Sequence, residues 1–515
     1  MSHESRCKKS RFQTSVKPMW QSSIFFVLLS LLCIPFIDLE LAHTSPLIEL
    51  RKMFDGLLHP NFIIDGVIDA LLHTVFFAIQ AVVLSSLVGF CIAQVYRLPG
   101  IRALMAFLRS IHELFWALIL IQIFGLSSLT GMLALAIPFC ATFARVFAEI
   151  QQETSKEAYH QLKGKHLSRF IYTTLPLAWP RISSYCKYRF ECALRASVVL
   201  GFIGLPTIGY QLDSYLKIGR YAEVAALIFI FIGLVLSMRF WANRFTMIIL
   251  FTFSIILLPP TTPPESTSED NVKMAYQLLN DITPTPIRNR SQNEIISDTQ
   301  LPSLLWDWFS PVLESQILPG VGYSLLLGQF AFALSAFLTL LWFPLISKHL
   351  IKRRIYRNIG YFVLTAIRCI PEFLLAFIAL ILLGPSLIPG IIALGLHNGA
   401  LLAHLVGQYS NELKLRSDTS TAPNLYFFEL IPRIYGQFLA FTLYRGETIL
   451  RETAILGILG IPTLGFFIDS TFEEFRLDRA FILILASAFL NIFAEQVSTL
   501  CRKHIHAYKP SLISR

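Results

Sequence analysis

Runs of about twenty consecutive apolar residues recur along the chain, and they limit its possible folds more strongly than any other feature of the sequence. A helix of about twenty apolar residues crosses the hydrocarbon core of a bilayer, which is about 30 Å thick. Hydrophobic residues make up 54% of the 515-residue chain and charged residues only 15%, whereas soluble domains carry roughly 25% charged residues. We therefore expect a membrane protein rather than a water-soluble one.

The spanning segments are expected to be helices. In hydrocarbon, only helices and closed barrels satisfy all backbone hydrogen bonds within the protein. The continuous apolar run at 22–36 lacks the alternation of apolar and polar residues that barrel strands show. The predicted fold class is therefore all-α integral membrane, with about 12 transmembrane helices on the length criterion.

The basic residues indicate how the chain is oriented. The formal net charge is +10, and Lys and Arg fall mainly in short loops at alternate helix ends, as the positive-inside rule describes. This distribution explains the charge without nucleic acid as a partner. It predicts a multi-pass protein of the inner (plasma) membrane, surrounded by lipid, with cytoplasmic tails at 1–20 and 499–515. The apolar run after residue 20 lacks a convincing cleavage site, so we expect an uncleaved first helix.

An internal duplication is visible in the residues themselves. Eleven positions recur exactly 256 residues later. The pairs are Tyr188 and Tyr444, Arg189 and Arg445, Glu191 and Glu447, Leu194 and Leu450, Arg195 and Arg451, Leu200 and Leu456, Gly201 and Gly457, Gly204 and Gly460, Pro206 and Pro462, Thr207 and Thr463, and Gly209 and Gly465. Chance does not keep one register over so many positions, so we infer two copies of one unit.

A second repeated motif lies 259 residues apart. Arg109, Ile111 and Glu113 recur as Arg368, Ile370 and Glu372. An even number of spans separates equivalent helices, so the two six-helix repeats are predicted to be parallel. We place the first transmembrane domain at 21–244 and the second at 245–498. A polar periplasmic loop, rich in Pro, Thr and Ser and therefore expected to be largely irregular, is placed at about 261–318.

A predicted cytoplasmic segment in the first half resembles the EAA loop of binding-protein-dependent ABC importers. In that family the loop forms a short coupling helix that docks on the ATPase subunit. Glu157, Ala158, Leu162 and Pro176 stand at the family spacing, and the candidate loop also includes Gly164 and Leu175. At the position where the family has a glycine, this chain has Lys163, and Gly164 follows one position later. The alternative is an ordinary amphipathic helix of a basic loop.

The equivalent segment of the second half, 413–432, keeps only Ile431 and Pro432 from this pattern. Its loop is therefore predicted to be degenerate, and coupling to the ATPase is predicted to be asymmetric.

The repeated block 188–204 resembles permeases of the phosphonate and phosphite importer family, and the motifs 109–113 and 147–149 add to the likeness. The resemblance implies a methionine-importer-like transmembrane domain in each half, two ABC ATPase subunits as partners, and a periplasmic substrate-binding protein. It also implies that the chain is not an enzyme: it binds no cofactor, and ATP-Mg binds to the separate ATPase. After Gly204 this chain departs from the glycine-rich run of its relatives.

Charged residues and glycines of the repeated block are candidates for the translocation pathway or the repeat core. These are Glu191, Arg195, Gly201, Gly204, Gly209, Glu447, Arg451, Gly457, Gly460 and Gly465. Each carboxylate lies four residues before an arginine, which permits pairing on one helix face. Ionisable groups within a membrane cost about 2.5–3.5 kcal/mol each to insert, so they face protein or water. A positive lining for an anion and a structural ion pair both remain open, and small-residue packing is the alternative for the glycines.

Two other classes of function are compatible with these patterns. One is a secondary transporter with two parallel repeats, coupled to an ion gradient; the other is a non-transporting scaffold or sensor derived from a permease. The histidines show no metal-ligand spacing, so no metal site is predicted. No Walker-type phosphate loop occurs, so ATP hydrolysis by this chain is not expected.

Overall fold

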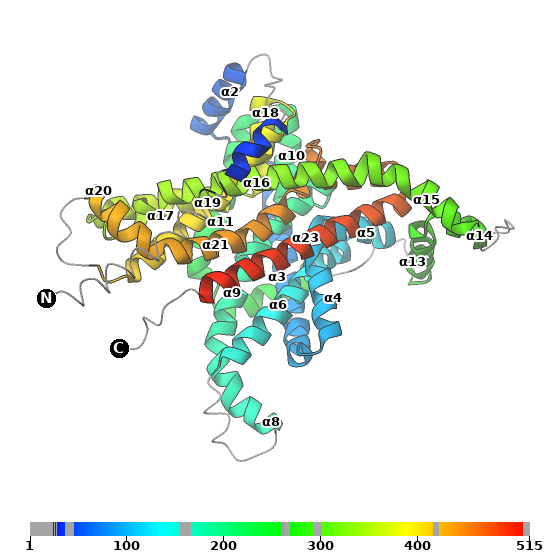
Figure 1. Cartoon of the computed structure of the whole chain (residues 1–515), viewed down its shortest axis with the longest axis horizontal. Coiled ribbons are helices and arrows are strands. Elements are labelled where there is room, and N and C mark those ends of the chain that lie inside the picture. Colours follow the sequence, from blue (N-terminus) through cyan, green and yellow to red (C-terminus); the bar gives the residue numbers. More distant parts are fainter. Residues whose placement is uncertain are drawn as a thin grey trace. The chain divides into compact units, whose positions relative to one another are not determined.

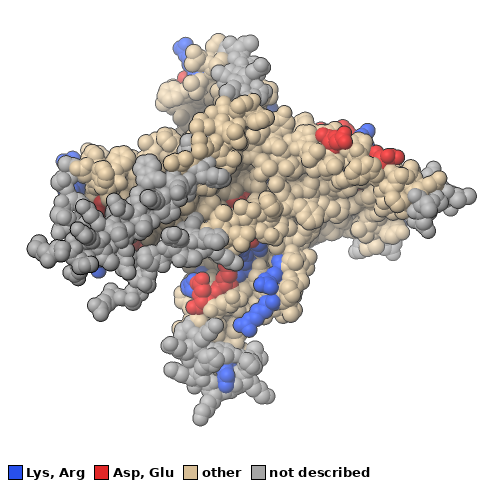
Figure 2. Space-filling view, viewed as in Figure 1, with Lys and Arg blue, Asp and Glu red and all other residues tan. Residues whose placement is uncertain are grey.

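The computed structural model describes residues 24, 26, 28–36, 46–154, 166–259, 261, 268–291, 300–415 and 422–507. All regular secondary structure within these ranges is helical (Figure 1), as the apolar runs predicted. In the described part of the chain, six helices are long and apolar enough to cross a membrane, and up to nine spans result if each bent helix pair is counted as one. Figure 2 shows charged side chains gathered in a few patches, with broad uncharged areas between them.

The chain divides into two compact units, which we describe separately. The N-terminal unit comprises Leu47–Ser315 and Ile468–Ile492, and the C-terminal unit comprises Met1–Pro46, Gln316–Phe467 and Phe493–Arg515. The helices from residue 46 to 315 are α2 (Pro46–Leu58), α3 (Val67–Val95), α4 (Pro99–Ser110), α5 (Glu113–Phe124), α6 (Ser128–Glu153), α8 (His166–Arg169), η2 (Phe170–Thr174), α9 (Leu175–Leu200), η3 (Gly201–Ile203), α10 (Ile208–Ile218), α11 (Tyr221–Trp241), α12 (Arg244–Leu257), α13 (Ser268–Ile282), α14 (Thr285–Ser291) and α15 (Leu301–Val312).

The remaining helices begin with the short η1 (Ile34–Phe36) and continue after α15. They are η4 (Leu313–Ile317), α16 (Leu318–Trp342), η5 (Phe343–Ile346), α17 (Arg354–Cys369), α18 (Glu372–Leu383), α19 (Leu387–Glu412), α20 (Ala422–Asn424), η6 (Leu425–Leu430), α21 (Ile431–Glu452), η7 (Ile455–Leu459), α22 (Leu464–Glu473) and α23 (Leu477–Ala507).

The core of the N-terminal unit lies between α3, α6 and α9. Phe77, Phe143 and Phe190, one from each of these helices, are essentially fully buried in one apolar cluster. α3 approaches α6 closely at Gly89, where a Cβ atom would lie 2.7 Å from the Cβ of Phe143. Small residues permit such approaches between membrane helices, where lipid supplies no hydrophobic driving force for association.

The core of the C-terminal unit is built on the pair α16 and α19. Three glycines of α19 receive side chains of the preceding helices: Gly395 lies under Leu334, Gly399 under Leu338 and Gly407 under Ile346. A Cβ at Gly395 would lie 2.4 Å from the Cδ2 of Leu334. The spacing of four between Gly395 and Gly399 is the small-xxx-small pattern of packed membrane helices.

The segment formed by α4 and α5 is sharply bent and not one straight helix. α4 and α5 meet at an angle of 89°, and the equivalent α17 and α18 meet at 84°. The backbone at Ile111 and His112 is extended, and the His112 Nδ1 accepts a hydrogen bond from the Leu114 amide at 3.2 Å. In the second bend, Pro371 precedes the first helical residue, where its missing N–H leaves no helical hydrogen bond unmade.

The segment predicted to be a largely irregular loop at 261–318 contains helices within its described residues, so that prediction was wrong there. α13, α14 and α15 occupy much of it. Its overall composition suggested irregular structure, but Leu278 on α13 and Val312 on α15 are buried, so apolar contacts stabilise these helices locally.

Helix α12 packs on the first long helix of the N-terminal unit. The buried Gln80 of α3 donates from Nε2 to the carbonyls of Ser254 and Leu258, at 2.9 and 2.8 Å. Leu258 is the C-cap residue of α12, and its carbonyl is among the last acceptors that a helix leaves unpaired, whereas the Ser254 carbonyl also accepts from the Leu258 amide at 3.0 Å. The division between the two domains predicted at 244–245 falls directly after the first residue of α12, whereas packing joins α12 to α3.

Candidate functional site

The central part of the predicted ATPase-coupling loop lies outside the described residues. This applies to Glu157, Ala158, Leu162 and Gly164. The loop's end is described: the π-helix η2 leads directly into α9, whose first two residues are Leu175 and Pro176. The Leu175 amide donates to the Phe170 carbonyl, five residues back.

The second half has the same geometry at its predicted loop end. The π-helix η6 leads into α21, which begins with Ile431 and Pro432, and the Ile431 amide donates to the Tyr426 carbonyl. Proline supplies no amide hydrogen, and a widened turn rearranges the hydrogen bonds around it. The two Pro-containing pairs that sequence reasoning selected thus share one local structure.

The predicted glycines of the first half form a tight connection between α9 and α10. Gly204 has φ 96°, in the left-handed region that favours glycine. A Cβ on Gly209 would lie 1.7 Å from the Val198 carbonyl oxygen, and one on Gly201 would lie 2.2 Å from the Tyr210 amide nitrogen. Close backbone contact therefore requires glycine at both positions, and the helix axis bends by 52° here.

The glycines of the second half repeat this geometry. Gly460 has φ 82°. A Cβ on Gly465 would lie 1.7 Å from the Ala454 carbonyl oxygen, and one on Gly457 would lie 2.0 Å from the Phe466 nitrogen. These contacts favour the packing interpretation of the glycines.

A hydroxyl from the first long helix of each half binds the start of the helix that follows this connection. The Thr74 hydroxyl on α3 accepts from the Ile208 amide at 3.0 Å. The Ser324 hydroxyl on α16 accepts from the Leu464 amide, also at 3.0 Å. Both hydroxyls are buried and satisfy an amide that the helix itself leaves unpaired.

The predicted charged candidates are all half-buried: Glu191, Arg195, Glu447 and Arg451. Arg195 donates from Nη2 to the Cys192 sulfur at 3.5 Å. Glu447 forms an ion pair with Arg502 of α23, with Oε1 and Nη2 2.8 Å apart. This partner of Glu447 comes from another helix, so a search of four-residue spacings along one helix does not find it.

A more deeply buried polar network lies between α19 and α21, and sequence reasoning missed two of its three members. Glu452 accepts from Arg445 Nη2 at 3.1 Å and from Asn398 Nδ2 at 3.0 Å. Arg445 Nε also donates to the Asn398 side-chain oxygen. Asn398 is fully buried, and the Arg445 and Glu452 side chains are 12% and 9% exposed, so the charges are held away from solvent.

In the first half, the arginine equivalent to Arg445 is Arg189, and its surroundings differ. The Arg189 guanidinium lies over the Phe139 ring, 4.2 Å from its centroid. Phe139 stands 259 residues before Asn398, and Ala196 stands 256 residues before Glu452. A half-buried guanidinium therefore lies on an aromatic face in the first half and beside a carboxylate in the second.

Each helix bend holds a carboxylate beside a histidine. Glu113 lies 3.8 Å from His112, and Glu372 lies 3.7 Å from His397 of α19. Among the described residues, no group of three or more His, Cys, Asp or Glu side chains is arranged to hold a metal ion.

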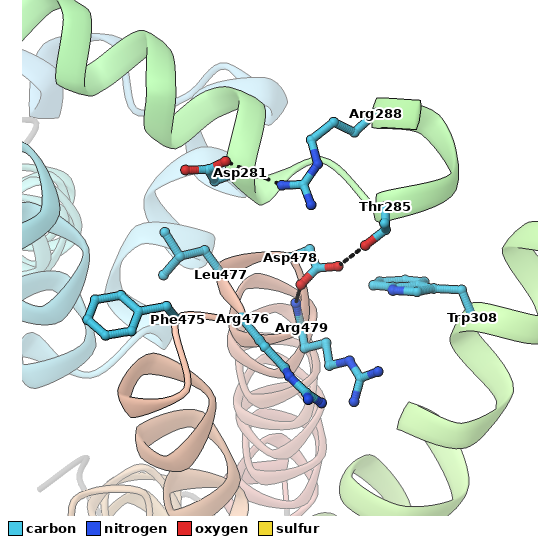
Figure 3. Close-up of a pocket in the computed structure, with 9 residues that line it drawn as sticks. All are labelled: Asp281, Thr285, Arg288, Trp308, Phe475, Arg476, Leu477, Asp478 and Arg479. Carbon is cyan, nitrogen blue, oxygen red and sulfur yellow. Dashed lines mark hydrogen bonds and ion pairs between the residues drawn. The ribbon is translucent and has the colours of Figure 1, made fainter. Parts of the chain in front are cut away.

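An open pocket of about 480 Å³ lies between the described part of the polar segment and the turn joining α22 to α23. Thr285 donates to Asp478 at 2.8 Å, and Arg288 pairs with Asp281 at 3.3 Å (Figure 3). Arg476 and Arg479 extend in the same direction beside Trp308 in this view.

Comparison with known proteins identifies relatives among transport permeases. The chain is 31% identical over 137 residues to the phosphite transport system permease protein PtxC of Stutzerimonas stutzeri, a match covering 26% of this chain and 50% of that protein. It is 22% identical over 423 residues to the phosphate-import permease protein PhnE of Mycolicibacterium smegmatis, covering 78% of this chain and 77% of that protein.

The chain thus spans about half the length of PtxC but most of the length of PhnE. No protein-family model matches the chain. No solved structure matches it either. The match to PhnE, at 423 residues, is longer than one copy of the repeat inferred from the sequence, so it reaches into both copies. The chain is therefore related to the permease proteins of phosphite and phosphate transport systems.

Proposed function

We propose that this chain is the transmembrane permease of an ATP-driven importer for phosphate, phosphite, phosphonate or a related small anion. The observation that carries this proposal is the likeness to PhnE over 423 residues, which includes both halves of the chain. The helical, apolar character of the described residues supports it. The proposed substrates are those for which the relatives PtxC and PhnE are named. The half-buried Arg195 and Arg451 are compatible with an anion.

We further propose that each half supplies one transmembrane domain and that the whole chain has about twelve spans as two parallel repeats. Corresponding helices support this proposal, because three local features recur at equivalent positions. These are the bends of 89° and 84°, the π-helices before Pro176 and Pro432, and the left-handed glycines at 204 and 460.

The mechanism we propose is alternating access driven by two separate ATPase subunits that bind ATP-Mg. Closure of the ATPases would move the segments near 157–176 and 413–432 and so rock the two halves. A periplasmic binding protein would deliver the solute. The pathway-lining residues would come from the interface of the halves.

Uptake of labelled phosphate and phosphite tests the proposed function. Cells that lack the gene are expected to lose uptake of at least one of these anions, and the restored gene is expected to recover it. Uptake should stop on ATP depletion but persist when an ionophore collapses the ion gradients. Uptake that instead follows the ion gradient and needs no ATPase would identify a secondary transporter, and unchanged uptake on deletion would identify a non-transporting protein.

Single cysteines test the proposed orientation in cells that express a cysteine-free chain. A cysteine at Arg288 should react with a membrane-impermeant thiol reagent added outside the inner membrane, because 261–318 is assigned to the periplasm. A cysteine at Lys352 should react only after permeabilisation, because Lys352 lies in a short basic loop that the positive-inside rule predicts to be cytoplasmic. The reverse pattern would invert the topology.

A further inference from the structure

Helix α2 (Pro46–Leu58) is attached to the rest of the N-terminal unit by one face. Gly56 is buried there: a Cβ at this position would lie 2.6 Å from the Tyr221 carbonyl carbon. The Tyr221 hydroxyl donates to Glu49 Oε2 at 2.9 Å. This face therefore holds α2 against the first residue of α11.

A second face of α2 is apolar and exposed. Its residues are Leu47, Leu50, Phe54, Leu57 and Leu58, with exposed fractions of 45% to 78%. At the helical period of about 3.6 residues per turn they fall within one continuous arc. Contiguous exposed apolar side chains of this kind mark an interaction surface.

The third face of α2 is predominantly polar. Arg51, Lys52 and Asp55 are exposed on it, with Ile48 among them. Lys52 pairs with Glu49 at 2.7 Å, at the border with the attached face. One face of α2 thus contacts the rest of the unit, a second face is suited to an apolar medium, and a third face is suited to water.

The attachment of α2 places it at the end of a membrane span. α11 begins at Tyr221, and Tyr221–Met238 is one of the candidate spans. The chain that follows α2 is fixed to the same end, since the Asn61 amide donates to the Ala222 carbonyl at 3.1 Å and Asn61 Nδ2 donates to Glu223 at 3.2 Å. Phe62 and Ile63, immediately after, are also exposed.

We propose that α2 lies in the plane of the membrane interface and binds the bilayer through the arc of Leu47, Leu50, Phe54, Leu57 and Leu58. A helix with a charged face and an opposing face of large apolar residues buries the apolar face about 5–10 Å into the boundary between headgroups and acyl chains. The bilayer is the occupant that the structure favours, because Tyr221 fixes α2 where a span meets that boundary. On the predicted topology this is the periplasmic leaflet.

Tryptophan substitution in the full-length protein, reconstituted into phosphatidylcholine bilayers, tests this proposal. Three variants place the probe on α2: Phe54→Trp and Leu50→Trp on the apolar arc, and Arg51→Trp on the polar face as the matched control. All three positions are exposed, so the substitutions leave the core of the unit unchanged. Emission of the unmodified protein is subtracted, and quenching by lipid brominated near the carbonyl end of its acyl chains is compared with quenching by aqueous iodide.

We expect brominated lipid to quench the added emission at 54 and 50 by about twofold more than at 51, because an interfacial helix buries only one face. Iodide should show the opposite order. Stronger iodide quenching at 54 than at 51 would overturn the proposal, since the arc would then face water. Protection of 54 and 50 from both quenchers would overturn it too, because a protein partner or a second copy would cover the arc.

Discussion

Arg445 and Glu452 form a buried ion pair seven residues apart along α21, with Nη2 and Oε1 3.1 Å from each other. Asn398 from α19 bonds to both side chains and closes the network. We expect Glu452→Gln to lower the free energy of unfolding by about 3–5 kcal/mol, because it leaves the Arg445 charge buried without a counter-charge. Denaturant unfolding in mixed micelles measures this change.

The matched control for this prediction is Glu474→Gln. Glu474 pairs with Arg476 at 3.3 Å, but both side chains are about half exposed. Removing such a pair changes stability by about 0–1 kcal/mol. Equal effects of the two substitutions would show that the Arg445 network contributes little to stability.

Gly209→Ala and Gly465→Ala should each lower the stability of the protein. A Cβ at Gly209 would lie 1.7 Å from the Val198 carbonyl oxygen, and one at Gly465 would lie 1.7 Å from the Ala454 carbonyl oxygen, so the backbone must move. Gly233 and Gly436 are exposed helical glycines with no atom within 4 Å of an added Cβ. There, alanine should stabilise by about 0.5–1 kcal/mol.

Thermal unfolding of the four single variants in detergent measures these effects. Similar melting temperatures for Gly209→Ala and Gly233→Ala would contradict the required backbone approach.

The hydroxyls on α3 and α16 give a paired prediction. Thr74→Val and Ser324→Ala should each lower stability by about 1–3 kcal/mol, because each leaves a buried amide, that of Ile208 or Leu464, without its acceptor. Thr252→Val is the control, since its exposed hydroxyl bonds only to the Ile248 carbonyl of its own helix. The prediction fails if the two buried substitutions are as mild as the exposed one.

The resemblance of the first loop to the EAA pattern gives a functional prediction. Charge reversal by Glu157→Lys should reduce uptake more than Thr419→Lys, because only the first loop keeps the pattern. Initial uptake rates, corrected for the amount of protein in the membrane, measure the difference. Equal losses in the two variants would indicate that both loops couple to the ATPase alike.

The helical class and the positions of the turn glycines could be predicted from the sequence. Long apolar runs predict helices, and a common register of 256 residues selected Gly204 and Gly460, both of which adopt positive φ. The 89° bend could not be predicted in this way. A hydropathy window averages over Ile111 and His112, although their backbone is extended.

The buried network shows a second limit of sequence reasoning. Four-residue spacing identified Glu191 with Arg195 and Glu447 with Arg451 as pairs on single helices. Arg445 and Glu452, by contrast, are seven residues apart, and their network includes a side chain from a different helix. Comparison of the halves contained a signal, because Asn398 and Glu452 are polar where Phe139 and Ala196 are not.

The hydrogen bonds of Gln80 affect where the chain can be split into two separately expressed polypeptides. Its amide binds the terminal carbonyls of α12, a helix that begins at the predicted division of the two domains. If the two parts were made as separate polypeptides cut between 244 and 245, α3 would carry a buried amide donor whose acceptors belong to the other fragment. A cut within 292–299 keeps Gln80 and α12 on one polypeptide, so complementation by co-expressed fragments should succeed more readily there.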